Sequence, residues 1–265
     1  MKRILALISL LVLLLPTIVL KAQTPPVATI VPFSEAGVTF QKYDPAISPN
    51  LAELAAANPD AARLLPYAGI LTNATNKRIT AVTVLWCPSG TPARTAPGDC
   101  LTLIQDGLYI VQQAVAEPGS KILITPANLW REESLGNGYI SVSTTALRGQ
   151  AEFLEANPGG RVELDVVIFD DGLIIGPDQS ETVAGIKARK AAAEAVSKAT
   201  LEALDRGEDP ASRLEAFVRR PGRPRTPTLR WSDSMVRMIL RSPDRRVPAQ
   251  QLSRIPDISN LHRAQ

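Results

Sequence analysis

Short apolar runs separated by glycine, proline and polar turns recur along the chain up to about residue 176. The run 79–86 carries apolar side chains on both of its faces, which predicts a central β-strand. Asp171-Gly172 lies between two runs rich in Val, Ile and Leu, and this predicts a β-hairpin. Further strands are predicted at 27–33, 37–41, 67–72, 101–104, 119–125, 138–144 and 160–169. Many short strands without alternating helices favour an antiparallel β-sandwich over a parallel α/β sheet.

The remainder of the chain has a helical pattern. Pro177 ends the strands, and Asp178 and Glu181 have the spacing of a capping box before an alanine-rich helix expected at about 179–205. The apolar positions of this helix form only a thin stripe, so we expect it to pack lightly or to project from the sandwich. Shorter helices are expected after Asp209-Pro210, from Ser232 or Asp233 to Arg241, and earlier at 51–57. From residue 242 onward we expect disorder. The predicted fold is mainly β, a sandwich followed by a helical C-terminal extension.

The N-terminus has the features of a signal peptide. Met1-Lys2-Arg3 is basic, residues 4–20 carry no charge, and Ala22 offers a small residue at a plausible cleavage point. The alternative is an uncleaved inner-membrane anchor, since residues 4–20 reach the lower limit for spanning a bilayer, but Pro16 and Ala22 favour cleavage. We therefore expect an exported protein, periplasmic or extracellular. The expected division is a signal peptide at 1–22, a sandwich domain at 23–178, a helical segment at 179–218 and an arginine-rich tail with one short helix at 219–265.

Cys87 and Cys100 are the only cysteines, and they flank a stretch rich in proline and glycine. In an oxidising compartment the simplest interpretation is a disulfide that closes this loop, worth about 3 kcal/mol by loop entropy. Catalytic and metal-binding pairs usually have C-x-x-C spacing, and two sulfurs without histidine cannot complete a zinc site. The spacing therefore favours a structural bridge.

The formal charge of +3 conceals a strong division along the chain. Residues 1–22 contain Lys2, Arg3 and Lys21, so the chain without them is neutral. Residues 219–265 hold 11 arginines and three aspartates, a charge of +8, which leaves −8 on residues 23–218. The tail contains no lysine, and the forked guanidinium groups of arginine suit carboxylate or phosphate partners.

Three kinds of partner fit this tail. It can dock on the acidic body of its own chain, bind another protein or an anionic polymer of the envelope, or rest on a membrane interface through Trp231 and the Met235 and Ile239 face. Nucleic acid is disfavoured, because the tail lacks the interleaved aromatic residues of a single-strand binder. The partner-binding candidates are Arg219, Arg220, Arg223, Arg225, Arg230, Trp231, Arg237 and Arg241.

The sequence offers little for catalysis. The single histidine, His262, lies three residues from the C-terminus, which disfavours histidine-based nucleophilic catalysis, and no glycine-rich phosphate loop precedes a helix. We expect no metal and no cofactor. The remaining candidates are the carboxylates of the 163–181 region, Asp165, Asp170, Asp171, Asp178 and Glu181. They could serve as calcium ligands or as an acid/base pair, but the calcium-loop pattern is absent. The preferred hypothesis is a non-enzymatic interaction or structural module of the bacterial cell envelope, and the alternative is a secreted hydrolase that uses these carboxylates.

The segment 169–178 (FDDGLIIGPD), followed directly by a helix, resembles uncharacterised secreted bacterial proteins with an immunoglobulin-like sandwich. The strand pair at 70–73 and 79–86 looks like part of the same kind of domain. The resemblance covers about residues 27–178 and implies an immunoglobulin-like fold. It implies no activity, and it does not extend to the arginine-rich tail.

The disulfide is directly testable in exported protein. We expect mass mapping under non-reducing conditions to find Cys87 and Cys100 in one bridged peptide pair. Replacing Cys87 with Ser should lower the free energy of unfolding by about 2–4 kcal/mol without abolishing the fold, because a chain of this size has its own core. Two alkylatable thiols in correctly exported protein would contradict the prediction.

Overall fold

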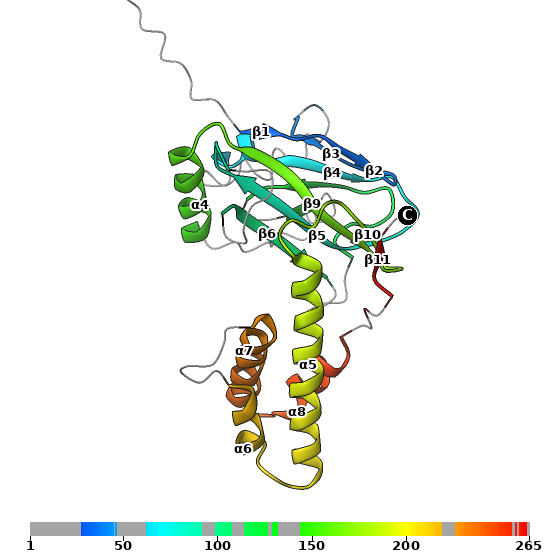
Figure 1. The fold of residues 1–265 in the computed structure, drawn as a ribbon, viewed down its shortest axis with the longest axis vertical. Coiled ribbons are helices and arrows are strands. Elements are labelled where there is room, and N and C mark those ends of the chain that lie inside the picture. Colours follow the sequence, from blue (N-terminus) through cyan, green and yellow to red (C-terminus); the bar gives the residue numbers. More distant parts are fainter. Residues whose placement is uncertain are drawn as a thin grey trace, which may run out of the picture.

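The computed structural model describes residues 28–44, 46, 62–91, 99–107, 114–126, 129–131, 144–218, 226–255, 258 and 260–263. In these residues two mostly antiparallel sheets form one end of the molecule, and a group of helices projects from them (Figure 1). The helix expected at 51–57 and all but the last residue of the strand expected at 138–144 lie outside the described residues, and that last residue, Thr144, is helical. Helix accounts for 38% and strand for 28% of the described residues, so "mainly β" applies to the sandwich and not to the described chain as a whole.

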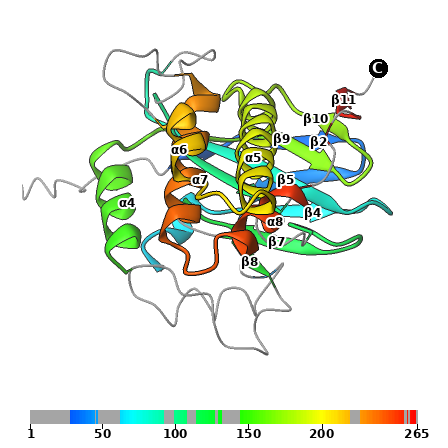
Figure 2. The ribbon, with the colours of Figure 1, turned by 90° about the horizontal axis from the view of Figure 1, so that it is seen from below.

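The first sheet has the order β2-β3-β4-β7-β8, and all of its neighbouring strands are antiparallel. Its strands are β2 (Phe33–Glu35), β3 (Val38–Lys42), β4 (Gly69–Asn73), β7 (Lys121–Ile124) and β8 (Leu129–Arg131). In Figure 2 the sheets are seen from the side of the projecting helices.

The second sheet has the order β11-β10-β9-β5-β6, and β1 also pairs with β9. Its strands are β1 (Thr29–Ile30), β5 (Ile79–Cys87), β6 (Leu101–Asp106), β9 (Arg161–Phe169), β10 (Leu173–Ile175) and β11 (His262–Arg263). β5 lies between β6 and β9, which confirms the central strand expected at 79–86. β1 and β11 pair in parallel with β9 and β10, so the N-terminal and C-terminal ends of the described chain both join this sheet.

Apolar side chains from both sheets share one core. Phe40 of the first sheet and Trp86 and Phe169 of the second are fully buried in it, and the Trp86 indole Nε1–H donates to the carbonyl oxygen of Tyr67 over 2.8 Å. Helix α4 (Thr144–Ala156) closes one end of this core, a helix that the strand pattern did not predict. Among its described side chains, Leu147, Ala151 and Leu154 are buried, a helical spacing that the sequence already contained.

The remaining helices form a second core. They are α5 (Thr182–Asp205), α6 (Ala211–Leu214), the 3₁₀ turn η3 (Glu215–Phe217), α7 (Pro227–Arg241) and α8 (Arg246–Ser253), which we call the helical lobe. α5 projects from the sandwich, as expected (Figure 1). It does not pack lightly, however, because α7 and α8 bury its face at Ala192, Ala193 and Val196. Alanine side chains let neighbouring helices approach closely, so counting only large apolar residues underestimates how tightly such a face packs.

Two local predictions were wrong. The region after residue 242 was expected to be disordered, but its described part forms α8 and β11. α7 begins at Pro227 rather than near Ser232, since the Thr226 side chain accepts a hydrogen bond from the Leu229 amide and caps the helix. The predicted β9–β10 hairpin is confirmed; Gly172 in its turn has positive φ, at 88°, and the Gly172 amide donates to the Phe169 carbonyl oxygen. The turn therefore closes over Asp170 and Asp171.

We predict that Gly69→Ala destabilises the sandwich by about 1–3 kcal/mol, because a Cβ on Gly69 would lie 2.2 Å from Cζ of the Phe40 ring. A second change, Phe40→Leu, should recover part of the loss by removing the clash. The matched control is Gly149→Ala in α4, where nothing lies within 4 Å and better helix propensity should give a gain of up to about 1 kcal/mol. Denaturant unfolding measures all three, and a neutral Gly69→Ala would contradict the expectation.

Candidate functional site

Of the predicted partner-binding residues, the structure describes the side chains of Trp231, Arg237 and Arg241. Arg219, Arg220, Arg223 and Arg225 lie outside the described residues, as does the side chain of Arg230. The described candidates, Trp231, Arg237 and Arg241, all lie on α7. Arg237 forms an ion pair of 3.0 Å with Asp233 one turn earlier, and Arg241 is exposed.

The apolar face of α7 cannot rest on a membrane in this structure. Met235 and Ile239 are 1% and 0% exposed, and they pack in the core of the helical lobe. The Trp231 ring is half-buried, with the Arg189 guanidinium of α5 4.3 Å from its centroid. The membrane-interface interpretation of this face is therefore wrong, because the face already has an intramolecular partner.

Three arginines in the described part of the tail instead pair with acidic residues earlier in the chain. Arg246 pairs with Asp205 at 2.8 Å, Arg245 pairs with Asp209, and Arg263 lies 3.8 Å from Asp178. The sequence did not single out these three arginines. The division into +8 and −8 was a signal for such docking, but it could not identify the pairs. Exposed ion pairs contribute little individually, so the apolar core beneath them supplies most of the stability.

A buried ion pair joins the helical lobe to the sandwich. The Arg189 Nη1 atom of α5 lies 2.8 Å from Oδ2 of Asp106 at the end of β6, and both side chains are largely buried. The same guanidinium faces Trp231, so it contacts β6 and α7 from one position on α5. The next residue of α5 forms a second contact, which holds the tail: Lys190 Nζ donates to the Ile255 carbonyl oxygen over 2.6 Å. Together these contacts fix the lobe and the tail to the sheet.

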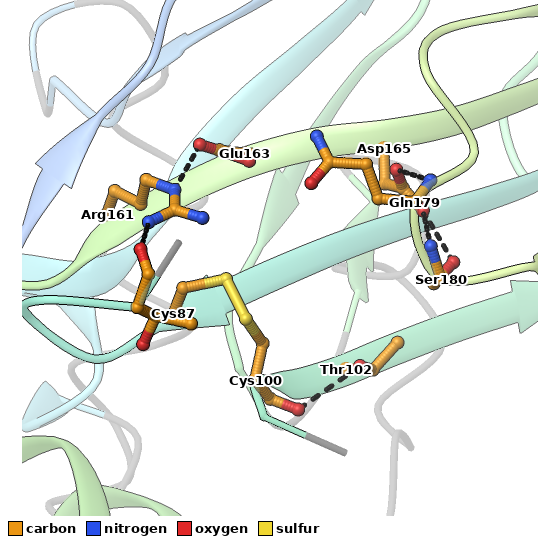
Figure 3. The surroundings of a disulfide bond; sticks show 9 residues. Cys87, Cys100, Thr102, Arg161, Glu163, Asp165, Gln179 and Ser180 are labelled. Atoms are coloured by element: carbon orange, nitrogen blue, oxygen red, sulfur yellow. Dashed lines mark hydrogen bonds and ion pairs between the residues drawn. A yellow bond between two sulfur atoms is a disulfide. The ribbon is translucent and has the colours of Figure 1, made fainter. Parts of the chain in front are cut away.

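The chain leaves the sandwich through a short segment, residues 176–182, which we call the elbow. The Asp165 carboxylate of β9 is 0% exposed and accepts hydrogen bonds from the Gln179 and Ser180 amides, at 2.7 and 3.0 Å, and from the Ser180 hydroxyl (Figure 3). The hydroxyl series continues from Ser180 to Thr182 at 2.7 Å and from Thr182 to Thr83 of β5 at 2.9 Å. The first residue of α5 is thus bonded directly to the sheet.

The elbow backbone is unusual for its sequence. Gly176, Asp178 and Glu181 all have positive φ, at 90°, 57° and 55°, and the last two lack the freedom of glycine. Glu181 occupies the N-cap position without a side-chain cap, so the predicted capping box does not form. Asp178 does contribute a cap, since its Oδ1 accepts from the Val183 amide at 3.2 Å. Burial raises the pKa of Asp178, and the neighbouring Asp165 carboxylate raises it further.

The carboxylates suggested for hydrolysis do not meet in a cleft. Asp165 is buried and bonded to the elbow, whereas Asp170 and Glu181 are exposed. Asp171 forms a 2.6 Å ion pair with Lys77, and the hydrogen bond from Lys77 lowers the pKa of Asp171. Within the described part of the chain, no three His, Cys, Asp or Glu side chains are grouped to hold a metal ion.

Cys87 and Cys100 form a disulfide with an S–S distance of 1.99 Å (Figure 3). The bond joins the end of β5 to the residue before β6, so it ties together two strands that are already paired. Beside it lies a pocket lined by residues that include Tyr67, Trp86 and Phe153, with room for about one water molecule. A cavity of this size does not accommodate an organic substrate.

No protein-family model matches the chain, and no curated protein and no solved structure matches it significantly. Among the described residues, none of the helices combines the length and the apolar character needed to cross a bilayer.

We predict that Asp165→Ala lowers the free energy of unfolding by about 2–5 kcal/mol, because it leaves the Gln179 and Ser180 amides without their acceptor. Asp170→Ala is the matched control, a neighbouring exposed carboxylate, and it should change stability by no more than about 0.5 kcal/mol. Chemical denaturation gives both values. Equal effects of the two substitutions would show that the buried carboxylate does not organise the elbow.

Proposed function

We propose that this protein is an exported, non-enzymatic interaction or structural module of the bacterial cell envelope. The observation that carries the proposal is the docking of the described tail on its own chain. Ion pairs to Asp178, Asp205 and Asp209 and a buried apolar core hold the tail in place. A protein built in this way presents a fixed surface to a partner. Asp165, a fully buried carboxylate in the described part of the chain, serves as a structural acceptor.

Export and fold class belong to the same proposal. The basic and apolar N-terminal sequence and the disulfide are consistent with an oxidising compartment. We further propose an immunoglobulin-like relationship for the sandwich. The neighbours β3-β4 and β5-β9-β10 can be matched to strands A-B and C-F-G of that fold, whereas β7 and β8 occur in the reverse of the usual E-D order.

The helical lobe offers the surface on which we expect a partner protein. The exposed large apolar residues of α7 and α8 are Met238, Leu240 and Val247, at 42%, 37% and 49%. Arg237 and Arg241 are exposed on α7 beside them. Since several tail arginines already have carboxylate partners, an anionic polymer or lipid surface is the second choice of partner.

A photo-crosslinking residue at Met238 tests the proposal in the full chain, expressed with its N-terminal segment in a bacterial host. We expect a defined adduct with an envelope protein. The matched control carries the crosslinking residue at the exposed Phe153 of α4, on the sandwich, and should not form that adduct. Recovery of the chain in the cytoplasm with reduced thiols would contradict export. Tight binding of the purified chain to anionic vesicles that weakens steeply with salt would assign the partner to a lipid surface instead.

A further inference from the structure

The C-terminal segment, residues 258 and 260–263, occupies the free edge of the second sheet. β11 adds to β10 in parallel, with Leu173 opposite His262 and Ile174 opposite Arg263. The His262 amide donates to the Gly172 carbonyl oxygen at 3.0 Å, and the Arg263 guanidinium donates to the Gly176 carbonyl oxygen at 2.7 Å. The backbone bond from residue 262 can be supplied by any extended peptide, whereas the bond to Gly176 requires the arginine side chain.

Side chains give the edge its selectivity. Ile258 is 7% exposed and packs in a cluster with Val166 and Ile168 of β9, Ile174 of β10 and Ile186 of α5. Leu261 packs against the same cluster from a partly buried position. This edge of the sheet therefore binds two apolar residues spaced three positions apart.

The charge of Asp178 and the lack of a side chain at Gly172 complete the binding site at this edge. Asp178 lies 3.8 Å from Arg263 and favours a basic residue two positions after the second apolar one. The Asn260 side-chain Nδ2 donates to the Asp171 carbonyl oxygen at 3.0 Å. Gly172 leaves room for Asn260, because a Cβ at Gly172 would lie 2.6 Å from the Asn260 carbonyl oxygen.

We propose that the edge of β10 is a peptide-binding site and that the protein's own C-terminal segment is its resident, displaceable occupant. The partner is an extended segment of another protein with two apolar residues three apart and an arginine two positions further on. Among the described residues β11 pairs with β10 through two residue pairs, so a partner peptide with a longer strand gains additional backbone bonds and can compete. The inference rests on the proposed interaction role. It adds a second binding surface, at the edge of β10, to the one proposed on the helical lobe.

The test uses the full chain with its own segment released by Ile258→Asp and Leu261→Asp. The probe is a labelled synthetic peptide of residues 255–265, followed by fluorescence anisotropy. We expect the released variant to bind the peptide, and wild-type protein to bind it at least about tenfold more weakly because its site is filled. A peptide carrying Leu261→Asp should also bind the released variant at least about tenfold more weakly.

A glycine pair controls for the geometry of the site. Adding Gly172→Ala to the released variant should abolish peptide binding, because the new Cβ occupies the position of Asn260. Gly207→Ala also places alanine at positive φ, at 72°, but nothing lies within 4 Å of its Cβ, so binding should persist. A milder release, Leu261→Gly with Arg263→Gly, decides the question if the first variant fails to fold.

Folded released variants that do not bind the peptide would overturn the proposal. A stable heterodimer between wild-type protein and a released variant would also overturn the proposed partner, because it would assign the site to a second copy of this chain. Peptide binding is measured without envelope material. If the peptide binds but no envelope-protein adduct forms, the peptide-binding site is supported and the proposed envelope role is contradicted.

Discussion

The buried carboxylate of Asp165 determines where the chain leaves the sandwich. A polar group in the interior is costly unless hydrogen bonds replace its hydration, and here two backbone amides and one hydroxyl do so. All three donors come from Gln179 and Ser180, immediately before α5. The carboxylate therefore holds the elbow against the middle of β9 and allows the positive φ angles of Asp178 and Glu181 to persist.

The direction of α5 follows from the elbow, and the other long-range contacts follow from α5. Once Thr182 is bonded to Thr83, the next two turns of the helix bring Arg189 to Asp106 and Trp231, and Lys190 to the Ile255 carbonyl oxygen. Further along, the alanine face receives α7 and α8. The tail then returns along the helix and reaches β10 within a few residues of Ile255 (Figure 1).

This arrangement changes the meaning of the arginine-rich tail. In the sequence it looks like a cationic extension available to any anionic partner. In the structure, ion pairs to Asp178, Asp205 and Asp209 use part of its charge, and apolar packing determines its path. The surfaces left for partners are then the exposed apolar residues of the lobe and the edge of β10. Both are defined by shape and hydrogen bonding more than by net charge.

Local pattern was sufficient for much of the sandwich. Alternating and continuous apolar runs located β5, β9 and the β9–β10 hairpin, because burial on one or both faces of a strand leaves a direct mark on neighbouring residues. The cysteines and the charge division were also visible in the sequence. Tertiary structure alone decided the role of Asp165, the partners of Arg189 and Arg263, and the order of the tail after residue 242. Each of these depends on residues distant in sequence that meet only after the sheets and α5 have formed, so no local periodicity records them.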